Sequence, residues 1–293
     1  MPDINLQALP GLLMLGLVNG SFYAILSLGL AVIFGLLGVV NFAHGALYMI
    51  GAYVAWYIND RWNISYWWAL LVGPLVVGAI GIVIERLFLK RLYKLDPLYG
   101  LLLTFGIALV LQGVFLQYYG SSGQSYSPPD QLSGATDLGF MVLPNYRAWV
   151  VLASLAICLG TWFMIERTQL GALLRAGTEN PALVQAFGVN VPLMVTLTYA
   201  GGCALAGFAG VLSSAVTQVN PLMGANLIIV VFAVVVIGGM GSIMGSIVTG
   251  LALGLIEKLP IVLGYPQASN IVVFVIMAVV LMIRPAGLFG KEK

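Results

Sequence analysis

The chain has 293 residues, of which 61% are hydrophobic and only 8% are charged. Soluble domains carry roughly 25% charged residues, so these few charges cannot cover a water-soluble core. The net charge of +2 is too small to indicate a nucleic-acid partner, and two cysteines are too few for a disulfide framework. The composition therefore predicts an all-α, polytopic helix bundle in a lipid bilayer.

The uncharged stretches predict where the chain crosses the membrane, because a helix needs about 20 apolar residues to cross a bilayer. Residues 4–59 have room for two crossings. The remaining predicted spans are, in chain order, residues 62–84, 98–118, 148–165, 191–217, 226–256 and 259–283.

Residues 226–256 contain a glycine-rich break and predict either one broken helix or two short helices. The positive-inside rule places the basic clusters at residues 90–94, 167–175 and 284–293 in the cytosol. An even number of crossings must then separate the second cluster from the third, which favours two short helices. The total is nine crossings with the N-terminus outside, and eight is the alternative.

Two segments are expected to lie outside the bilayer within a single domain over residues 1–293. Residues 120–147 are rich in Gly, Ser and Pro and are expected on the outer side, and residues 166–190 are expected in the cytosol. Pairs of small residues at four-residue spacing, such as Gly16/Gly20 and Gly250/Gly254, predict close helix packing. Cys158 and Cys203 are expected to be small packing residues.

A short apolar helix is predicted inside the cytosolic segment. Asn180 is a favoured N-cap, Pro181 suits the first helical position, and Gly188 can end the helix in the left-handed conformation. A helix of two turns does not persist alone in water, so its apolar side chains need cover. Either it folds against this chain or the lipid, or it enters a groove on a cytosolic partner.

The second informative segment surrounds His44, the one histidine of the chain. Asn41 can cap a new helix that starts near Phe42, between the flexible Gly38 and Gly45. A helix N-terminus inside a bundle carries partial positive charge and suits a carboxylate. The segment is interpreted as a pathway or gate lining, as a structural cap with His44 bonded to a carbonyl, or as a metal or proton site. A lone histidine argues against a metal.

Uncharged polar residues inside the spans are further candidates to contact a solute. Amides have more groups to satisfy than hydroxyls and rank higher. The predicted pathway or gate residues are Asn19, Ser21, Tyr23, Asn41, Phe42, His44, Gly45, Tyr48, Thr104, Gln112 and Gln218. No catalytic or metal-binding residue is predicted.

Several of these stretches resemble the permeases of branched-chain amino acid ABC importers. They are residues 19–24, 41–53, 178–190, 238–245 and the ending Arg284-Pro285-Ala286-Gly287-Leu288-Phe289-Gly290. The resemblance covers essentially the whole chain and is closer to the LivH-type subunit of the permease pair. It implies a type II-like importer bundle in the bacterial inner membrane.

The resemblance also implies partners: a second homologous permease, two cytosolic ATPases and a periplasmic solute-binding protein. ATP and Mg²⁺ are expected on the ATPases, with no cofactor on this chain, which contains no phosphate-binding loop and is not expected to be an enzyme. The cytosolic helix then looks like the element that enters an ATPase groove. Its expected coupling residues are Glu179, Asn180, Pro181, Ala182, Leu183, Gln185, Ala186, Phe187 and Gly188.

The expected activity is import of branched-chain or other apolar amino acids by alternating access. Relatives of this permease type also move urea, short amides and aromatic or dicarboxylic acids, so other solutes remain an alternative. A stand-alone secondary transporter or channel is a second class. A third is an intramembrane hydrolase that uses His44 with Ser242, but no orienting residue accompanies the two.

Overall fold

The computed structural model describes residues 9–93, 95–139 and 141–290. Lys94, Lys291 and Lys293 of the predicted basic clusters lie outside the described residues. The helices of the described part are α1 (Leu9–Leu37), α2 (His44–Trp62), α3 (Tyr66–Leu87), α4 (Pro97–Tyr119), α5 (Asn145–Arg167), α6 (Gln169–Glu179), α7 (Pro181–Ala186), α8 (Val191–Ser213), α9 (Met223–Gly238), α10 (Ile243–Ile256), α11 (Leu259–Val262) and α12 (Ser269–Ile283). Three-residue 3-10 helices lie at Leu89–Arg91, Asp130–Leu132 and Pro266–Ala268.

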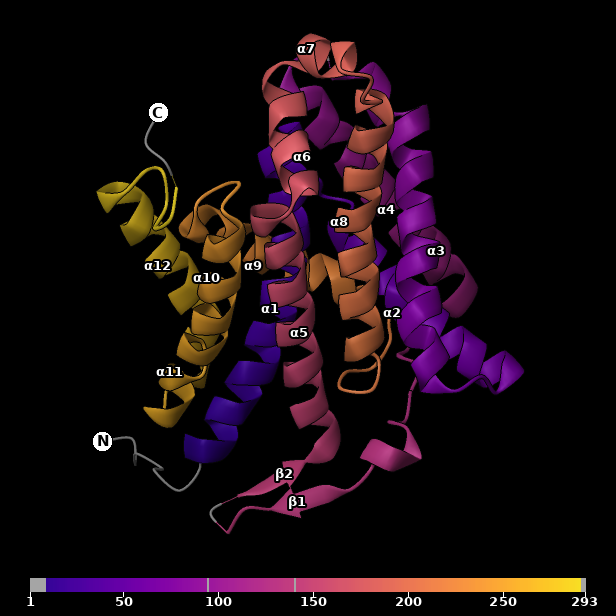
Figure 1. Cartoon of the computed structure of the whole chain (residues 1–293). Coiled ribbons are helices and arrows are strands. Elements are labelled where there is room, and N and C mark those ends of the chain that lie inside the picture. The colour runs from indigo at the N-terminus through magenta and orange to yellow at the C-terminus, as the bar shows by residue number, and fades with distance from the viewer. Residues whose placement is uncertain (1–8, 94, 140, 291–293) are drawn as a thin grey trace.

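The long helices lie side by side in one bundle, with α7 at one end and the strands β1 (Ala135–Asp137) and β2 (Val142–Pro144) at the other (Figure 1). We call these the inner end and the outer end. The predicted cytosolic segment contains α6 and α7, and the predicted outer segment contains the strands. The two segments therefore lie at opposite ends of the bundle.

Six helical segments are long and apolar enough to cross a membrane. They contain α1, α3, α4, α5, α8 and α10, and α9 and residues 271–283 are shorter apolar helices. The chain is therefore a polytopic helical membrane protein. The number of crossings stays a prediction.

The glycine-rich break at residues 239–242 separates α9 from α10 as two helices, and the crossing of the membrane by each of them stays a prediction. Gly239 and Gly241 have φ values of 98° and 87°, which favour glycine because it has no Cβ. The C-terminal turn packs against this break, where the Leu288 N–H donates to the Ile237 carbonyl at 2.8 Å.

The outer segment differs from its predicted bounds. Helix α5 begins at Asn145, directly after the extended Pro144, so Arg147 lies in the first turn of this helix and not in the loop. The strands β1 and β2 form an antiparallel pair, with Thr136 opposite Leu143. This small sheet and an isolated antiparallel bridge between Gln124 and Val219 depart from the all-α expectation.

Glycine pairs bring the central helices into backbone contact, as predicted. A Cβ added to Gly16 of α1 would lie 2.7 Å from the carbonyl oxygen of Gly254 in α10, and one on Gly20 would lie 2.9 Å from that of Leu251. On α8, a Cβ on Gly210 would overlap the carbonyl oxygen of Tyr48 in α2. Helix α4 differs, because its buried residues are Gly100 and Thr104 alone.

Candidate functional site

The segment between α1 and α2 is not helical, and side-chain hydrogen bonds stabilise it in place of the backbone hydrogen bonds of a helix. The Asn41 side-chain oxygen accepts from the Ala43 N–H at 3.1 Å, and α2 begins at His44, two residues later than predicted. From α4, the Thr104 hydroxyl accepts from the Phe42 N–H at 3.1 Å and reaches the carbonyl of Val40 at 3.2 Å. Asn41 and Thr104 therefore cap this break, residues 38–43, from two sides.

His44 lies deep in the bundle. A Cβ added to Gly29 of α1 would lie 2.9 Å from the imidazole Nε2, so the histidine packs against a position eight residues before the end of α1. Eight helical residues rise about 12 Å, so the break folds back into the bundle from the inner end. Both imidazole nitrogens and the Asn41 side-chain nitrogen are buried without a hydrogen-bond partner in the described chain. Unpaired buried polar groups are costly and mark places where water or a solute is accommodated.

Three further candidates line an apolar cavity of about 300 Å³ at the break. Phe42 and Gly45 form one wall, and Gln112 of α4 contributes an amide. The Phe42 ring packs against Phe232 with centroids 5.8 Å apart and against Phe105 at 6.3 Å. The break therefore borders an apolar cavity as well as unpaired polar groups.

The outer end contains a second cavity of about 300 Å³, which we call the outer cavity. It gathers four of the predicted residues from three parts of the chain: Asn19 and Tyr23 of α1, Tyr48 of α2 and Gln218 after α8. Ser21 is not among them, because its hydroxyl donates to the Leu17 carbonyl of its own helix at 2.8 Å. Its predicted role as a pathway residue has no support in this geometry.

Buried carboxylates were missed by the sequence analysis. Glu257, directly after α10, accepts from the Tyr23 hydroxyl at 2.7 Å and pairs with Lys258 at 2.8 Å. Its side chain is 10% exposed and that of Lys258 is 15% exposed. A charge at the end of an apolar run looks the same in sequence whether it faces water or the bundle, so no signal was available.

Glu85 near the end of α3 is the second buried carboxylate, with 1% exposure. It accepts from the Thr196 hydroxyl of α8 at 2.7 Å and from the Tyr93 hydroxyl at 3.1 Å. Burial, with the Glu85 charge close by, raises the pKa of Tyr93, so this phenol stays protonated and donates. The Thr196 hydroxyl therefore ties α3 to α8 at the inner end, and the Tyr93 hydroxyl ties the segment after α3 back to this helix.

The predicted short helix is present as α7. The Asn180 side chain accepts from the Leu183 N–H at 3.1 Å, Pro181 is the first helical residue, and Gly188 has a φ of 83°. Val184 is buried against the chain, whereas Leu183 and Phe187 are 54% and 80% exposed. The other predicted coupling residues, Glu179, Ala182, Gln185 and Ala186, are exposed as well. The apolar face of α7 therefore lacks the cover that a two-turn helix needs.

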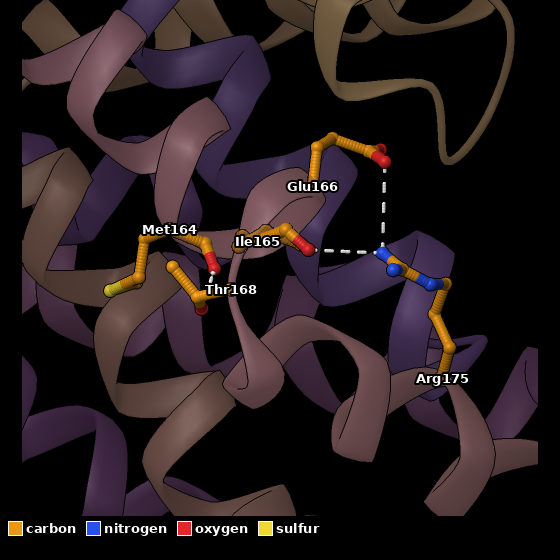
Figure 2. Close-up of polar contacts among 5 residues, drawn as sticks. All are labelled: Met164, Ile165, Glu166, Thr168 and Arg175. Atoms are coloured by element: carbon orange, nitrogen blue, oxygen red, sulfur yellow. Dashed lines mark hydrogen bonds and ion pairs between the residues drawn. The ribbon is translucent and has the colours of Figure 1, made fainter.

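Polar contacts hold the turn between α5 and α6 (Figure 2). The Arg175 guanidinium donates to the Ile165 carbonyl at 3.0 Å and lies 3.7 Å from the Glu166 carboxylate. The Thr168 hydroxyl donates to the Met164 carbonyl. The Arg175 side chain of α6 therefore satisfies a carbonyl in the last turn of α5, where a helix carbonyl has no partner within its own helix.

A cavity of about 440 Å³ at the inner end joins the break to the short helix. Gly38 and Val39 of the break line it together with Tyr93. Thr178 and Pro181, on either side of the start of α7, complete the wall. Residues of the break and of α7 therefore border one shared cavity.

Comparison with known proteins bears on this arrangement. The sequence model of the family described as "Branched-chain amino acid transport system / permease component" matches residues 12–281. The chain is 29% identical over 290 residues to the high-affinity branched-chain amino acid transport system permease protein BraD of Pseudomonas aeruginosa, covering 95% of this chain and 94% of BraD.

The chain is also similar to two Escherichia coli K12 permease proteins of the high-affinity branched-chain amino acid transport system. It is 30% identical to LivH over 298 residues, covering 95% of this chain and 94% of LivH. It is 26% identical to LivM over 299 residues, covering 92% of this chain and 68% of LivM. No solved structure matches the chain.

Proposed function

Because this chain belongs to the family of branched-chain amino acid transport permease components, we propose that it imports branched-chain or other apolar amino acids as a subunit of an ATP-driven complex. The permeases it resembles are transport components, so the chain carries solute and its partners hydrolyse ATP. ATP and Mg²⁺ are held by those partners. The complex lies in a bacterial inner membrane.

The proposed partners are a second permease, two cytosolic ATPases and a periplasmic binding protein. Similarity to both LivH and LivM, which carry the same transport-system name, supports a pair of homologous permeases. The binding protein docks at the outer end, partly on the loop and strands that precede α5. The ATPases bind at the inner end.

The proposed solute route runs from the outer cavity past the break to the cavity at the inner end. Asn19, Tyr23, Tyr48 and Gln218 receive the solute. Between these two cavities the route is closed. Asn41 and His44 lie at this closed point, and their side chains carry buried nitrogens without a hydrogen-bond partner. The route is mainly apolar elsewhere, which favours amino acids with apolar side chains.

The exposed apolar face of α7 is the single observation that carries the ATP-driven assignment. Leu183 and Phe187 project from α7, whose first turn is capped by Asn180. Arg175 anchors the preceding helix α6 to α5, so this face is held rigidly. Such a helix fits a hydrophobic groove on a partner. Closure of the ATPases then moves α7 together with α6 and α8, which it contacts, and changes the shape of the cavity at the inner end that α7 shares with the break.

The double substitution Leu183→Asp and Phe187→Asp tests this assignment. A carboxylate in an apolar groove is strongly disfavoured, so we expect ATP-driven leucine uptake into proteoliposomes to fall at least tenfold while the protein stays in the membrane. ATP hydrolysis by the complex should no longer respond to loaded binding protein. Leu263→Asp, a half-exposed leucine beyond α11, is the matched control and should transport normally.

Normal uptake by the double variant would contradict the coupling role of α7.

The buried Glu85 favours a second candidate function, a stand-alone transporter coupled to protons, since buried carboxylates often serve proton transfer in membranes. Leucine accumulation by the purified chain alone, driven by a proton gradient without ATP, would establish that candidate instead.

A further inference from the structure

An open groove of about 570 Å³ runs between α5, α6 and α8 toward the inner end of the bundle. Met164 of α5, Leu173 of α6 and Leu197 of α8 line it, and these side chains are between 39% and 55% exposed. The buried Val32 of α1 and Gly202 of α8 line it as well, so the groove reaches the centre of the bundle. We call it the α5–α8 groove.

The α5–α8 groove has little to offer a polar guest. Its polar lining side chains, within the described chain, are Thr161, Asn190 and Thr198. The Thr198 hydroxyl donates to the Met194 carbonyl of its own helix at 2.8 Å. The Asn190 side-chain oxygen accepts from the Leu193 N–H at 3.1 Å and caps the same helix. Both groups already have a partner, so the groove suits an apolar guest.

The shape of the groove distinguishes between two apolar guests, a helix and a hydrocarbon chain. Along α8 the lining runs from Asn190 to Leu205, and fifteen helical residues rise about 22 Å. A volume of 570 Å³ over this length gives a mean cross-section of about 26 Å², whereas a helix about 10 Å wide needs about 80 Å². At about 30 Å³ for each methylene, the size of a water molecule, the groove holds roughly 19 methylene groups. A single acyl chain therefore fits, and a helix does not.

The wall of the groove carries a cation where α5 gives way to α6. Arg167 is exposed and lies between the lining residues Ile165 and Leu170. Its guanidinium lies 5.6 Å from the centre of the Trp162 ring, and tryptophan is enriched at the membrane surface. Arg175 is paired with Glu166, whereas Arg167 forms no ion pair with the residues that the structure describes. A charge is therefore available here for an anion.

We propose that the α5–α8 groove binds one acyl chain of an anionic phospholipid and that Arg167 holds the phosphate of its headgroup. Anionic lipids of the cytoplasmic leaflet attract basic residues near the membrane surface. The lipid comes from the leaflet at the inner end, where α5 ends. The proposal goes beyond the proposed function and is independent of the solute.

The bound chain lies close to the break. A Cβ added to Gly202 would lie 2.9 Å from the Gly29 carbonyl oxygen, and one added to Gly29 would lie 2.9 Å from the His44 Nε2. The backbones of α8 and α1 therefore separate the groove from His44. A lipid chain in the groove fills the space between α5 and α8 and packs against the side of α8 that carries this contact.

Native mass spectrometry of the purified protein tests the site. The full chain, with the subunits that accompany it, is exposed to equal amounts of dioleoyl phosphatidylglycerol and dioleoyl phosphatidylcholine, and loosely bound lipid is then stripped. The parent should retain the anionic lipid in at least fivefold excess. Arg167→Gln should lose this excess. Leu197→Trp places an indole in the groove and should lower retention of phosphatidylglycerol at least fivefold.

Two substitutions on α3 are the matched controls. Arg86→Gln removes an exposed cation in the last turn of this helix, and Leu75→Trp adds the same indole at a leucine that is 72% exposed outside the groove. Both variants should retain phosphatidylglycerol as the parent does. The thermal unfolding midpoint of each variant shows that loss of lipid is not loss of the fold.

Equal retention of the two lipids by the parent would overturn the role of the charge. Loss of the excess in Arg86→Gln to the same extent as in Arg167→Gln would show attraction by the whole inner surface and overturn the role of Arg167. Unchanged retention by a folded Leu197→Trp variant would remove the groove as the site. Lipid retained by the isolated chain but absent from the assembled complex would show that another subunit covers the groove, and would overturn the proposal.

Discussion

Thr104 gives the break a hydrogen bond that no helix provides. Its hydroxyl accepts from the Phe42 N–H and has the carbonyls of Val40 and Leu101 within 3.2 Å. The side chain is fully buried, so water cannot replace it. One hydroxyl of a peripheral helix therefore fixes the backbone next to Asn41 and His44.

Replacing Thr104 by valine keeps the shape and removes this hydroxyl. The Phe42 N–H is then left without its partner, which costs about 1–3 kcal/mol for a buried donor. We expect a lower thermal unfolding midpoint for the purified protein and slower leucine uptake. Thr104→Ser retains the hydroxyl and should lie close to the parent in both measurements, and equal behaviour of the two variants would contradict the role of this bond.

At the scale of elements, the α5–α6 turn determines how the short helix is connected to the bundle. Gly171 of α6 packs so closely on α5 that a Cβ there would overlap the Ile165 carbonyl oxygen. This is the carbonyl to which Arg175 donates. Gly171 and the Arg175 guanidinium therefore converge on one oxygen. Figure 2 shows the contact of Arg175 with this oxygen.

Gly171→Ala should separate α6 from α5, because backbone atoms cannot move aside as a flexible side chain can. We expect the number of leucine molecules imported per ATP hydrolysed to fall severalfold. Gly160→Ala in α5 is the matched control, since nothing lies within 4 Å of a Cβ at that position. The Gly160→Ala variant should leave this ratio unchanged. Its free energy of unfolding should stay the same or rise by about 0.5–1 kcal/mol, because alanine favours the helix. Equal ratios for both variants would show that this contact does not serve coupling.

At the scale of the whole molecule, the predicted orientation in the membrane can be tested at the two ends of the bundle. Cysteines introduced as Ser133→Cys near β1 and Thr178→Cys in α6 occupy opposite ends, and the native cysteines are buried. A membrane-impermeant maleimide added to intact cells should label the first position and not the second. Inverted vesicles should give the reverse pattern, and labelling of both positions from one side would contradict the topology.

Local signals explain which parts of the fold could be predicted. The cap, proline and glycine of α7 are contiguous in sequence, and the charge-free runs mark helices without knowledge of their neighbours. The outer cavity could not be predicted, because Asn19, Tyr48 and Gln218 meet only after α1, α2 and the segment beyond α8 have packed together. The burial of Glu85 and Glu257 is likewise a result of long-range packing, and Ser21 turned to its own backbone.

The glycine contacts also limit how the molecule can change shape. Where α1 meets α10, and α2 meets α8, backbone lies directly against backbone, so no layer of side chains is available to adopt new rotamers. Gly29 of α1 and Gly202 of α8 meet in the same way and join the two pairs, so these four helices should move as one rigid body. Rearrangement during a transport cycle is then confined to the seams around this body, at α4, α5 and the connections near the break.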